Sequence, residues 1–216
     1  MTKVKFCGLR RPEDAAHALL LGAAYGGVIF AKSKRQVTPR QAQEVLDAAQ
    51  SLTRVGVFTR ETIPAILKIA VEARLDVLQL HAQFTPDEHA QLRQEFDGEI
   101  WSVIGIDPET GSCSASWKDV ADFADALLLD TSRGGRSGGT GEMFDWKKAA
   151  PLIHAISTEI PVVLAGGLKP DNVAAAIEIL QPAVVDVSSG VEVSPGVKSP
   201  ELMTAFARSV ASASIV

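Results

Sequence analysis

The feature that most constrains the fold of this chain is a repeated alternation between short apolar runs and longer segments with helical periodicity. The apolar runs are rich in Val, Ile and Leu, which is typical of strands covered on both faces. They predict strands over residues 3–7, 27–30, 54–58, 77–80, 100–104, 126–130, 162–165 and 184–187. The periodic segments predict helices over residues 12–21, 39–49, 63–73, 86–96, 117–123, 146–157, 170–180 and 200–211. The pattern therefore indicates repeated βα units and a parallel sheet.

Eight βα units are the number that closes a barrel, and 216 residues are enough for one. We therefore predict an α/β fold, a single (β/α)₈ TIM barrel, that occupies residues 1–216 as one domain. The alternative is an open doubly wound sheet, but no Gly-x-Gly-x-x-Gly follows the first predicted strand and no Walker A pattern is present. We expect the fifth unit to be irregular, because residues 107–116 resemble a long loop.

Composition excludes several classes of partner. The formal net charge of −5 and the lack of a polybasic run argue against nucleic acid and membrane surfaces as partners. The longest uncharged run, residues 18–31, is shorter than the ~20 apolar residues that a membrane span needs. The chain enters a strand-like run directly, without the pattern of an export signal. Its two cysteines form no disulfide framework, so we expect a cytoplasmic location.

Two reactive side chains end predicted strands, where barrel enzymes build their active sites. Cys7 ends the first strand, just before Gly8, and Asp130 ends the sixth, after an apolar run. The start of a helix nearby could lower the pKa of the Cys7 thiol, and the apolar residues before Asp130 could raise the pKa of its carboxyl. Such a pair can act as base and acid. The alternatives are a small buried hydrophobe at Cys7 and a cap or turn residue at Asp130.

The loops after the last two predicted strands carry glycines and hydroxyls. Gly166 and Gly167 follow the seventh strand, and Ser188, Ser189 and Gly190 follow the eighth. Barrels commonly bind phosphate at these two loops through backbone N–H groups. Each segment alone could be only a tight turn, but the two together predict a phosphate site.

Three further features fall at the predicted barrel mouth. Arg35 could hold a substrate carboxylate through its guanidinium fork, or belong to a solvated basic face. His81 could line the pocket or bond a backbone carbonyl. The glycine-rich residues 131–142 could form a lid over bound substrate, or a solvated loop. We expect Asp145 to cap the next helix and Cys113 to have no catalytic part.

The sequence lacks the usual motifs of a metal site and of a serine hydrolase. The remaining histidines, His17, His89 and His154, fall within predicted helices without a His-x-x-x-His pair, and no Cys-x-x-Cys or Gly-x-Ser-x-Gly is present. We therefore expect neither a metal site nor a serine nucleophile.

An ordered set of motifs from residue 3 to about 199 resembles the phosphoribosylanthranilate isomerase family of tryptophan biosynthesis. The motifs are Lys-Phe-Cys-Gly-Leu (5–9), Val-Gly-Val-Phe (55–58), Val-Leu-Gln-Leu-His (77–81), Leu-Leu-Asp-Thr (128–131), Gly-Gly-Thr-Gly (138–141), Phe-Asp-Trp (144–146), Ala-Gly-Gly-Leu (165–168), Asn-Val (172–173) and Asp-Val-Ser-Ser-Gly-Val-Glu (186–192). Departures are small: Phe6 stands where the family often has Ile, and Ala82 where it usually has Gly.

The resemblance implies an Amadori rearrangement of N-(5-phosphoribosyl)anthranilate to 1-(2-carboxyphenylamino)-1-deoxyribulose 5-phosphate. It makes Cys7 the general base and Asp130 the general acid, and it places Arg35 at the anthranilate carboxylate. The segments Gly166-Gly167 and Ser189-Gly190 match the family's phosphate loops. No cofactor is implied, and the partner is a small phosphorylated sugar–anthranilate substrate, with the chain a monomer or a homodimer.

Two classes of alternative stay open. Other phosphosugar barrels are the related imidazole-ribotide isomerase, which normally uses two aspartates, and indoleglycerol-phosphate synthase, which relies on strand-end lysines that we do not find. A barrel that accepts two related substrates also fits. A non-catalytic phosphate-ligand binding module is the alternative from a different class, but it would need neither Cys7 nor Asp130.

Overall fold

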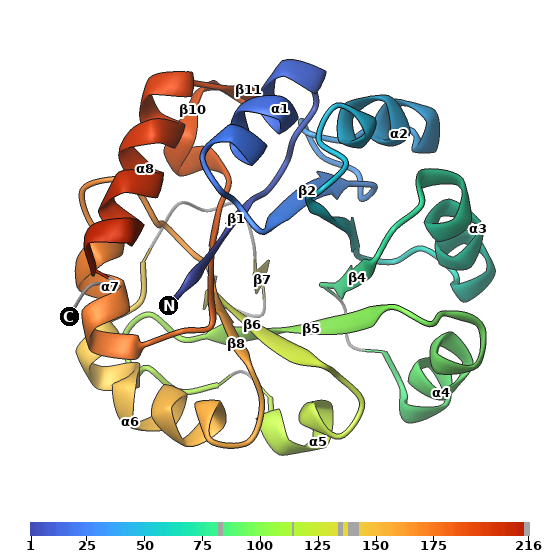
Figure 1. Cartoon of the computed structure of the whole chain (residues 1–216). Coiled ribbons are helices and arrows are strands. Elements are labelled where there is room, and N and C mark those ends of the chain that lie inside the picture. Colours follow the sequence, from blue (N-terminus) through green and yellow to red (C-terminus); the bar gives the residue numbers. More distant parts are fainter. Residues whose placement is uncertain (82–83, 114, 134–135, 138–142, 214–216) are drawn as a thin grey trace.

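Eight parallel strands form a closed ring at the centre of the computed structural model (Figure 1), which describes residues 1–81, 84–113, 115–133, 136–137 and 143–213. Around the ring the strands are β1 (Lys3–Phe6), β2 (Tyr25–Ile29), β3 (Thr53–Phe58), β4 (Val77–Leu80), β5 (Glu99–Ile106), β6 (Ala126–Arg133), β8 (Val162–Leu164) and β9 (Val184–Val187). The pairing of β9 with β1 closes the ring. This arrangement confirms the predicted (β/α)₈ barrel and excludes the open sheet.

The helices surround the ring (Figure 1). They are α1 (Pro12–Leu20), α2 (Pro39–Asp47), α3 (Ile63–Ala73), α4 (Pro86–Glu95), α5 (Trp117–Ala121), α6 (Trp146–Ser157), α7 (Val173–Leu180) and α8 (Pro200–Ala213). Capping boxes start α2 and α4, with Thr38 and Thr85 as the caps. The predicted cap at Asp145 is confirmed, because its side chain accepts hydrogen bonds from two backbone N–H groups of α6. No helix among the described residues is long and apolar enough to cross a bilayer.

Some predicted boundaries were wrong. Helix α7 begins at Val173 rather than at residue 170, because the Asn172 side chain accepts a hydrogen bond from Lys169 N and holds a turn there. Asp130 does not end its strand, since β6 continues to Arg133 and pairs with the short antiparallel strand β7 (Arg136–Ser137). The rest of the predicted lid, residues 134–135 and 138–142, lies outside the described residues. The irregular fifth unit is confirmed by the five-residue helix α5.

Alternation of side chains along the strands produces two layers of core. Outward-facing residues such as Leu127 and Val185 pack under the helices, and inward-facing residues fill the barrel. The inner cluster contains Tyr25, Val55, Val77, Trp101, Ala126, Leu128, Val163, Ala165 and Val184. Gln79, Asp130 and Asp186 also face the barrel interior. Each lies two residues after a member of the inner cluster on the same strand. The barrel interior therefore changes from apolar to polar towards the carboxyl ends of the strands.

A small addition lies between β9 and α8. The one-turn helix η1 (Ser189–Val191) leads into a hairpin of β10 (Glu192–Ser194) and β11 (Val197–Lys198). This hairpin places Glu192 and Lys198 beside the barrel mouth, as the ion pairs described below show.

Candidate active site

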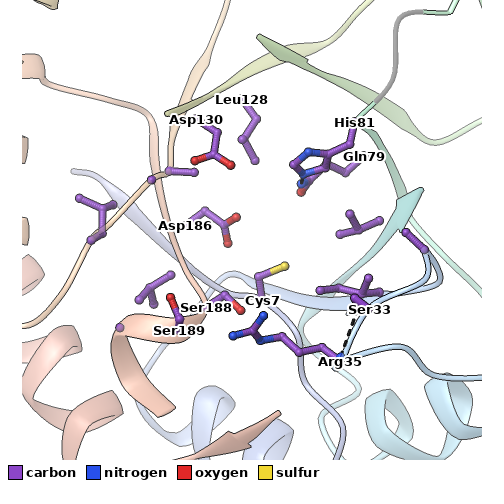
Figure 2. Close-up of a pocket in the computed structure, with 18 of the residues that line it drawn as sticks. Cys7, Ser33, Arg35, Gln79, His81, Leu128, Asp130, Asp186, Ser188 and Ser189 are labelled. Atoms are coloured by element: carbon purple, nitrogen blue, oxygen red, sulfur yellow. Dashed lines mark hydrogen bonds between the residues drawn. The ribbon is translucent and has the colours of Figure 1, made fainter. Parts of the chain in front are cut away.

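A pocket of about 270 Å³ opens at the carboxyl ends of the barrel strands. Figure 2 shows Cys7, Asp130 and Asp186 around it, with His81 and Gln79 at one side and Arg35 at another. All eight predicted site residues line this pocket: Cys7, Arg35, His81, Asp130, Gly166, Gly167, Ser189 and Gly190. Their predicted proximity is therefore confirmed, while their roles stay predictions.

Cys7 follows the last residue of β1 and is 5% exposed. The next residue, Gly8, has a φ of +72°, in the left-handed region that glycine adopts readily. Burial raises the pKa of the Cys7 thiol above its ordinary value, and the nearby charge of Lys5 opposes this rise. The suggested lowering of this pKa was wrong, because desolvation outweighs the neighbouring positive charges.

Asp130 lies inside β6 and is 8% exposed. Burial raises the pKa of its carboxyl to about 6, although a hydrogen bond from Thr131 N to Asp130 Oδ1 at 2.8 Å acts in the opposite direction. The predicted rise of this pKa is confirmed. At neutral pH this carboxyl can gain or lose a proton with little cost in free energy.

An ion pair between Lys5 and Asp186 lies in the same region, and the sequence analysis gave neither residue a role. Lys5 Nζ is 2.9 Å from Asp186 Oδ1, and both side chains are buried. The two atoms are within ion-pair distance but are not aligned as a hydrogen bond. The signal was present in the sequence, because Lys5 precedes Cys7 by two residues and therefore faces the barrel interior with it.

The guanidinium fork of Arg35 binds a carboxylate of the chain itself. Arg35 Nε and Nη2 donate to Glu192 Oε1 and Oε2 at 2.8 and 2.7 Å. Lys198 Nζ donates to Glu192 Oε1 at 2.9 Å, and all three side chains are mostly or fully buried. Arg35 also lines the pocket. The solvated-face alternative is therefore wrong, and the fork that we expected to hold a substrate carboxylate is engaged by Glu192.

His81 and Gln79 form one wall of the pocket. Their side-chain Nε2 atoms are 2.9 Å apart, which fits a neutral imidazole that accepts a hydrogen bond from the amide. Burial, aided by the charge of Lys5, lowers the pKa of His81 to about 4, so the ring is neutral at physiological pH. Gln79 Oε1 is buried and has no hydrogen-bond partner among the described residues. An acceptor of this kind can receive a hydrogen bond from a ligand hydroxyl.

The two predicted phosphate loops lie side by side at the pocket, because they follow the paired strands β8 and β9, and a Cβ atom on Gly190 would meet the backbone oxygen of Leu168. Gly166 and Gly167 both have positive φ, at +85° and +66°. Asn172 Nδ2 donates to Gly167 O at 3.0 Å and fixes this loop. In the neighbouring loop, Ser188 Oγ is buried without a hydrogen-bond partner in the described part of the chain. An unpaired hydroxyl donor beside a glycine loop fits an anion such as phosphate.

Sequence reasoning missed the groups that surround the proposed reactive pair. Gln79 and Asp186 are polar residues at inward positions of apolar strands, a signal that alternation could have revealed. Glu192 and Lys198 belong to a hairpin that no sequence pattern predicted. Among the described residues, no group of three or more His, Cys, Asp or Glu side chains is arranged to hold a metal ion.

A closed parallel barrel with a buried thiol and a buried carboxylic acid in its mouth defines a barrel enzyme equipped for proton transfer. Residues 4–209 match the family model of N-(5'phosphoribosyl)anthranilate (PRA) isomerase. The chain therefore belongs to this family. It is an isomerase of tryptophan biosynthesis that converts N-(5-phosphoribosyl)anthranilate to 1-(2-carboxyphenylamino)-1-deoxyribulose 5-phosphate.

Individual members of the family are similar to this chain over nearly its whole length. N-(5'-phosphoribosyl)anthranilate isomerase from Caldanaerobacter subterraneus subsp. tengcongensis is 40% identical over 212 residues, which cover 97% of this chain and 98% of the relative. Monomers generated from the dimeric phosphoribosylanthranilate isomerase of Thermotoga maritima have a TM-score of 0.82 at 31% identity, with 98% and 100% coverage. A phosphoribosylanthranilate isomerase in complex with reduced 1-(o-carboxyphenylamino)-1-deoxyribulose 5-phosphate has a TM-score of 0.81 at 30% identity and the same coverage. The predicted family, fold and activity are thus confirmed.

Proposed function

We propose that Cys7 and Asp130 carry out the isomerisation as general base and general acid. The observation that supports this most directly is that both groups are buried in one pocket and have pKa values raised by burial. Proton transfer between such groups and a bound sugar needs no redox or carrier chemistry, so the proposed route requires no cofactor.

In the first step, Asp130 donates its proton to the ring oxygen of the phosphoribosyl group. The bond between C1 and the ring oxygen breaks, the electron pair stays on that oxygen as the new hydroxyl, and the nitrogen lone pair forms a protonated Schiff base. Asp130 is left as a carboxylate. Its pKa of about 6 suits this step, because the protonated acid stays accessible at neutral pH at a small cost in free energy, whereas a carboxyl of ordinary pKa would be protonated much more rarely.

In the second step, the Cys7 thiolate removes the proton from C2. The C2–H electron pair forms the C1=C2 bond of a neutral enolamine, and the iminium nitrogen recovers its lone pair. The enolamine then tautomerises: its C2 hydroxyl loses a proton, C1 gains one, and the aminoketose results. The step leaves Cys7 as a thiol and Asp130 as a carboxylate, so one proton must return from the thiol to the carboxylate through solvent before the next turnover.

We propose that the loops after β8 and β9 hold the substrate phosphate. Gly166, Gly167, Ser189 and Gly190 supply backbone N–H groups, and the unpaired Ser188 hydroxyl is a further donor. Arg35 then orients the anthranilate carboxylate with the edge of its guanidinium that Glu192 does not occupy. His81, neutral and beside Gln79, forms the wall of the sugar and ring site.

We further infer a cytoplasmic location and a chain that is active as a monomer or as a homodimer. Both cysteines are free, as expected in a reducing compartment. The residues proposed to carry the reaction lie together in the mouth of a single barrel, an arrangement that fits either state.

The test is turnover of phosphoribosylanthranilate, generated in situ and followed by loss of its fluorescence together with formation of the aminoketose. Cys7→Ala and Asp130→Asn should each lower kcat by at least ~100-fold, the range that general acid–base groups contribute. Binding of the reduced product analogue should be nearly unchanged in both. Near-normal turnover of either variant would remove that residue from the mechanism.

A further inference from the structure

The proposed mechanism leaves one buried pair of charges without a role. Lys5 and Asp186 are opposite each other in the ladder of β1 and β9, and their charged atoms are 2.9 Å apart. Lys5 is fully buried and is not among the residues that line the pocket. A buried ion pair is a weak source of stability, because apolar residues of similar size usually stabilise a core as well. Structural need alone therefore does not account for a lysine inside the barrel.

The position of Lys5 relates it to the thiol. Lys5 and Cys7 are two residues apart and therefore face the same side of the chain. A Cβ atom placed on Gly27 of β2 would lie 3.1 Å from Cys7 Sγ and 3.3 Å from Lys5 Cε, so both side chains pass over the same glycine. Lys5 Nζ makes an ion pair with Asp186 but no aligned hydrogen bond within the described chain, and its side chain interacts electrostatically with Cys7. Its N–H groups are thus available to a thiolate.

The charges around Cys7 favour its thiolate once Asp130 holds the proton. The groups that act on it or on its neighbours are Lys5, Arg35, His81, Asp130, Asp186, Glu192 and Lys198. With Asp130 protonated and His81 neutral, three cations face only two carboxylates. One positive charge is then in excess, and a thiolate at Cys7 neutralises it.

The protonation of Lys5 agrees with this picture. Burial acts to lower the pKa of Lys5, but the negative charges of Asp186 and ionised Cys7 outweigh it, and the pKa is raised. Lys5 therefore stays an ammonium group throughout. For Cys7 the largest effect is burial, which raises its pKa, and Lys5 is the strongest of the groups that oppose it.

We propose that Lys5 is a positioning residue for the isomerisation: its ammonium group, fixed by Asp186, is the counter-ion that stabilises the Cys7 thiolate. The inference rests on the proposed role of Cys7 as the base. In the free enzyme the thiol proton passes to the Asp130 carboxylate through solvent in the pocket, which creates the thiolate and the protonated acid together. Lys5 keeps all its protons and does not touch the substrate.

The first experiment measures ionisation of the thiol directly. In a Cys113→Ala background Cys7 is the only cysteine, and the pH dependence of its alkylation by iodoacetamide gives the midpoint of thiolate formation. Lys5→Met should raise this midpoint by about one to three pH units, the size of effect that one nearby opposite charge produces. The same variant should lower kcat at pH 7 by ~10-fold or more, with recovery at higher pH and little change in KM. Lys3→Met, on the same strand but exposed above Tyr25, is the matched control and should leave the midpoint unchanged.

A second pair of variants keeps the test informative if Lys5→Met does not fold. Asp186→Asn should lower the midpoint, because the charge of Asp186 raises the pKa of Cys7. Adding Lys5→Met to Asp186→Asn removes the ammonium without leaving a buried lone carboxylate, and it should raise the midpoint again. A midpoint that does not change between these two variants, or between wild type and Lys5→Met, overturns the proposal. Turnover by Cys7→Ala would instead overturn the role of Cys7 itself, so the two failures are distinguishable.

Discussion

At the level of single residues, the pocket gives its two reactive groups the protonation states opposite to those that the reaction uses. The pKa of Asp130 is raised to about 6, and that of Cys7 is raised above its ordinary value, which already lies above neutral pH. A neutral solution therefore contains mainly Asp130 carboxylate and Cys7 thiol. The reactive form holds the same number of protons, with the acid on Asp130 and the thiolate on Cys7. Among molecules in which the Cys7–Asp130 pair holds one proton in total, this reactive form is a minor fraction, and that fraction does not change with pH.

This assignment predicts a bell-shaped pH dependence of kcat/KM. As pH rises through about 6, the pair loses the first of its two protons and activity increases. Activity then stays level and decreases only above the raised pKa of Cys7, where the second proton is lost. Steady-state kinetics between pH 5 and 10 provide the measurement. An acid limb near pH 4, the ordinary value of a carboxyl group, would contradict the raised pKa of Asp130.

A control is needed because the substrate phosphate also ionises near pH 6. Affinity for the reduced product analogue, measured over the same range, isolates the effect of phosphate on binding. The acid limb of kcat should remain after this effect is subtracted, since it belongs to the Cys7–Asp130 pair.

Arg35 gives a second prediction at this scale. Arg35→Ala should weaken binding of the reduced product analogue by ~10- to 100-fold, as expected for loss of a charged hydrogen bond. An otherwise identical ligand without the aromatic carboxylate should bind both proteins almost equally, which calorimetry can establish. Arg40→Ala is a suitable control, because Arg40 is an exposed arginine that also pairs with a glutamate, Glu44, on α2. Equal losses for both ligands would assign Arg35 a purely structural role through Glu192.

At the level of elements, the strand–loop junctions fix the positions of the reactive groups. The β8–α7 loop passes so close to β6 that a Cβ atom on Gly166 would lie 2.9 Å from Asp130 Oδ1 and 2.6 Å from Thr131 Oγ1. Its φ of +85° also lies in the left-handed region that side chains avoid. The loop thus requires glycine here for two separate reasons.

Gly166→Ala should therefore lower kcat by about 100-fold, because displacement of a catalytic group by ~1 Å has an effect of this size. It should also reduce the free energy of unfolding by ~1–2 kcal/mol through backbone strain. Gly22→Ala separates the two effects, since Gly22 has a φ of +76° but nothing within 4 Å of an added Cβ. That variant should show the loss of stability, measured by urea unfolding, and normal turnover. Equal activity of the two variants would show that contact with Asp130 does not matter.

The sequence predicted the bounds of helices and strands well where local periodicity sets them, and less well where tertiary contacts set them. The bounds of α3, α6, β4 and β9 agree with prediction, because each is a clear periodic or apolar segment. The extension of β6 depends on its antiparallel pairing with β7, which no local pattern reveals. The Arg35–Glu192 pair joins residues 157 positions apart, so it required the fold. The direction of the Cys7 pKa was wrong for a similar reason, since desolvation depends on packing from the whole barrel mouth.

At the level of the whole molecule, closure of the ring joins the two ends of the chain. Strand β1 pairs with β9, and α8 covers them with Phe206, whose ring centroid is 6.1 Å from that of Phe6. Both phenylalanines are fully buried. We propose on this basis that the chain is a single domain, since neither half can complete the barrel or bury its strands alone.

A single domain predicts that damage at this junction destabilises the entire molecule. Phe206→Ala should reduce the free energy of unfolding by ~3–5 kcal/mol, as large-to-small changes in a core do. Leu20→Ala, on the neighbouring helix α1 but 83% exposed, should change it by less than ~0.5 kcal/mol. Urea unfolding followed by circular dichroism, which reports all helices, and by tryptophan fluorescence, which includes Trp101 inside the barrel, should give coincident transitions in the wild type and in both variants. If Phe206→Ala separated the two transitions, so that the helices melted while Trp101 stayed buried, the barrel would contain a subdomain that is stable without its closing helix.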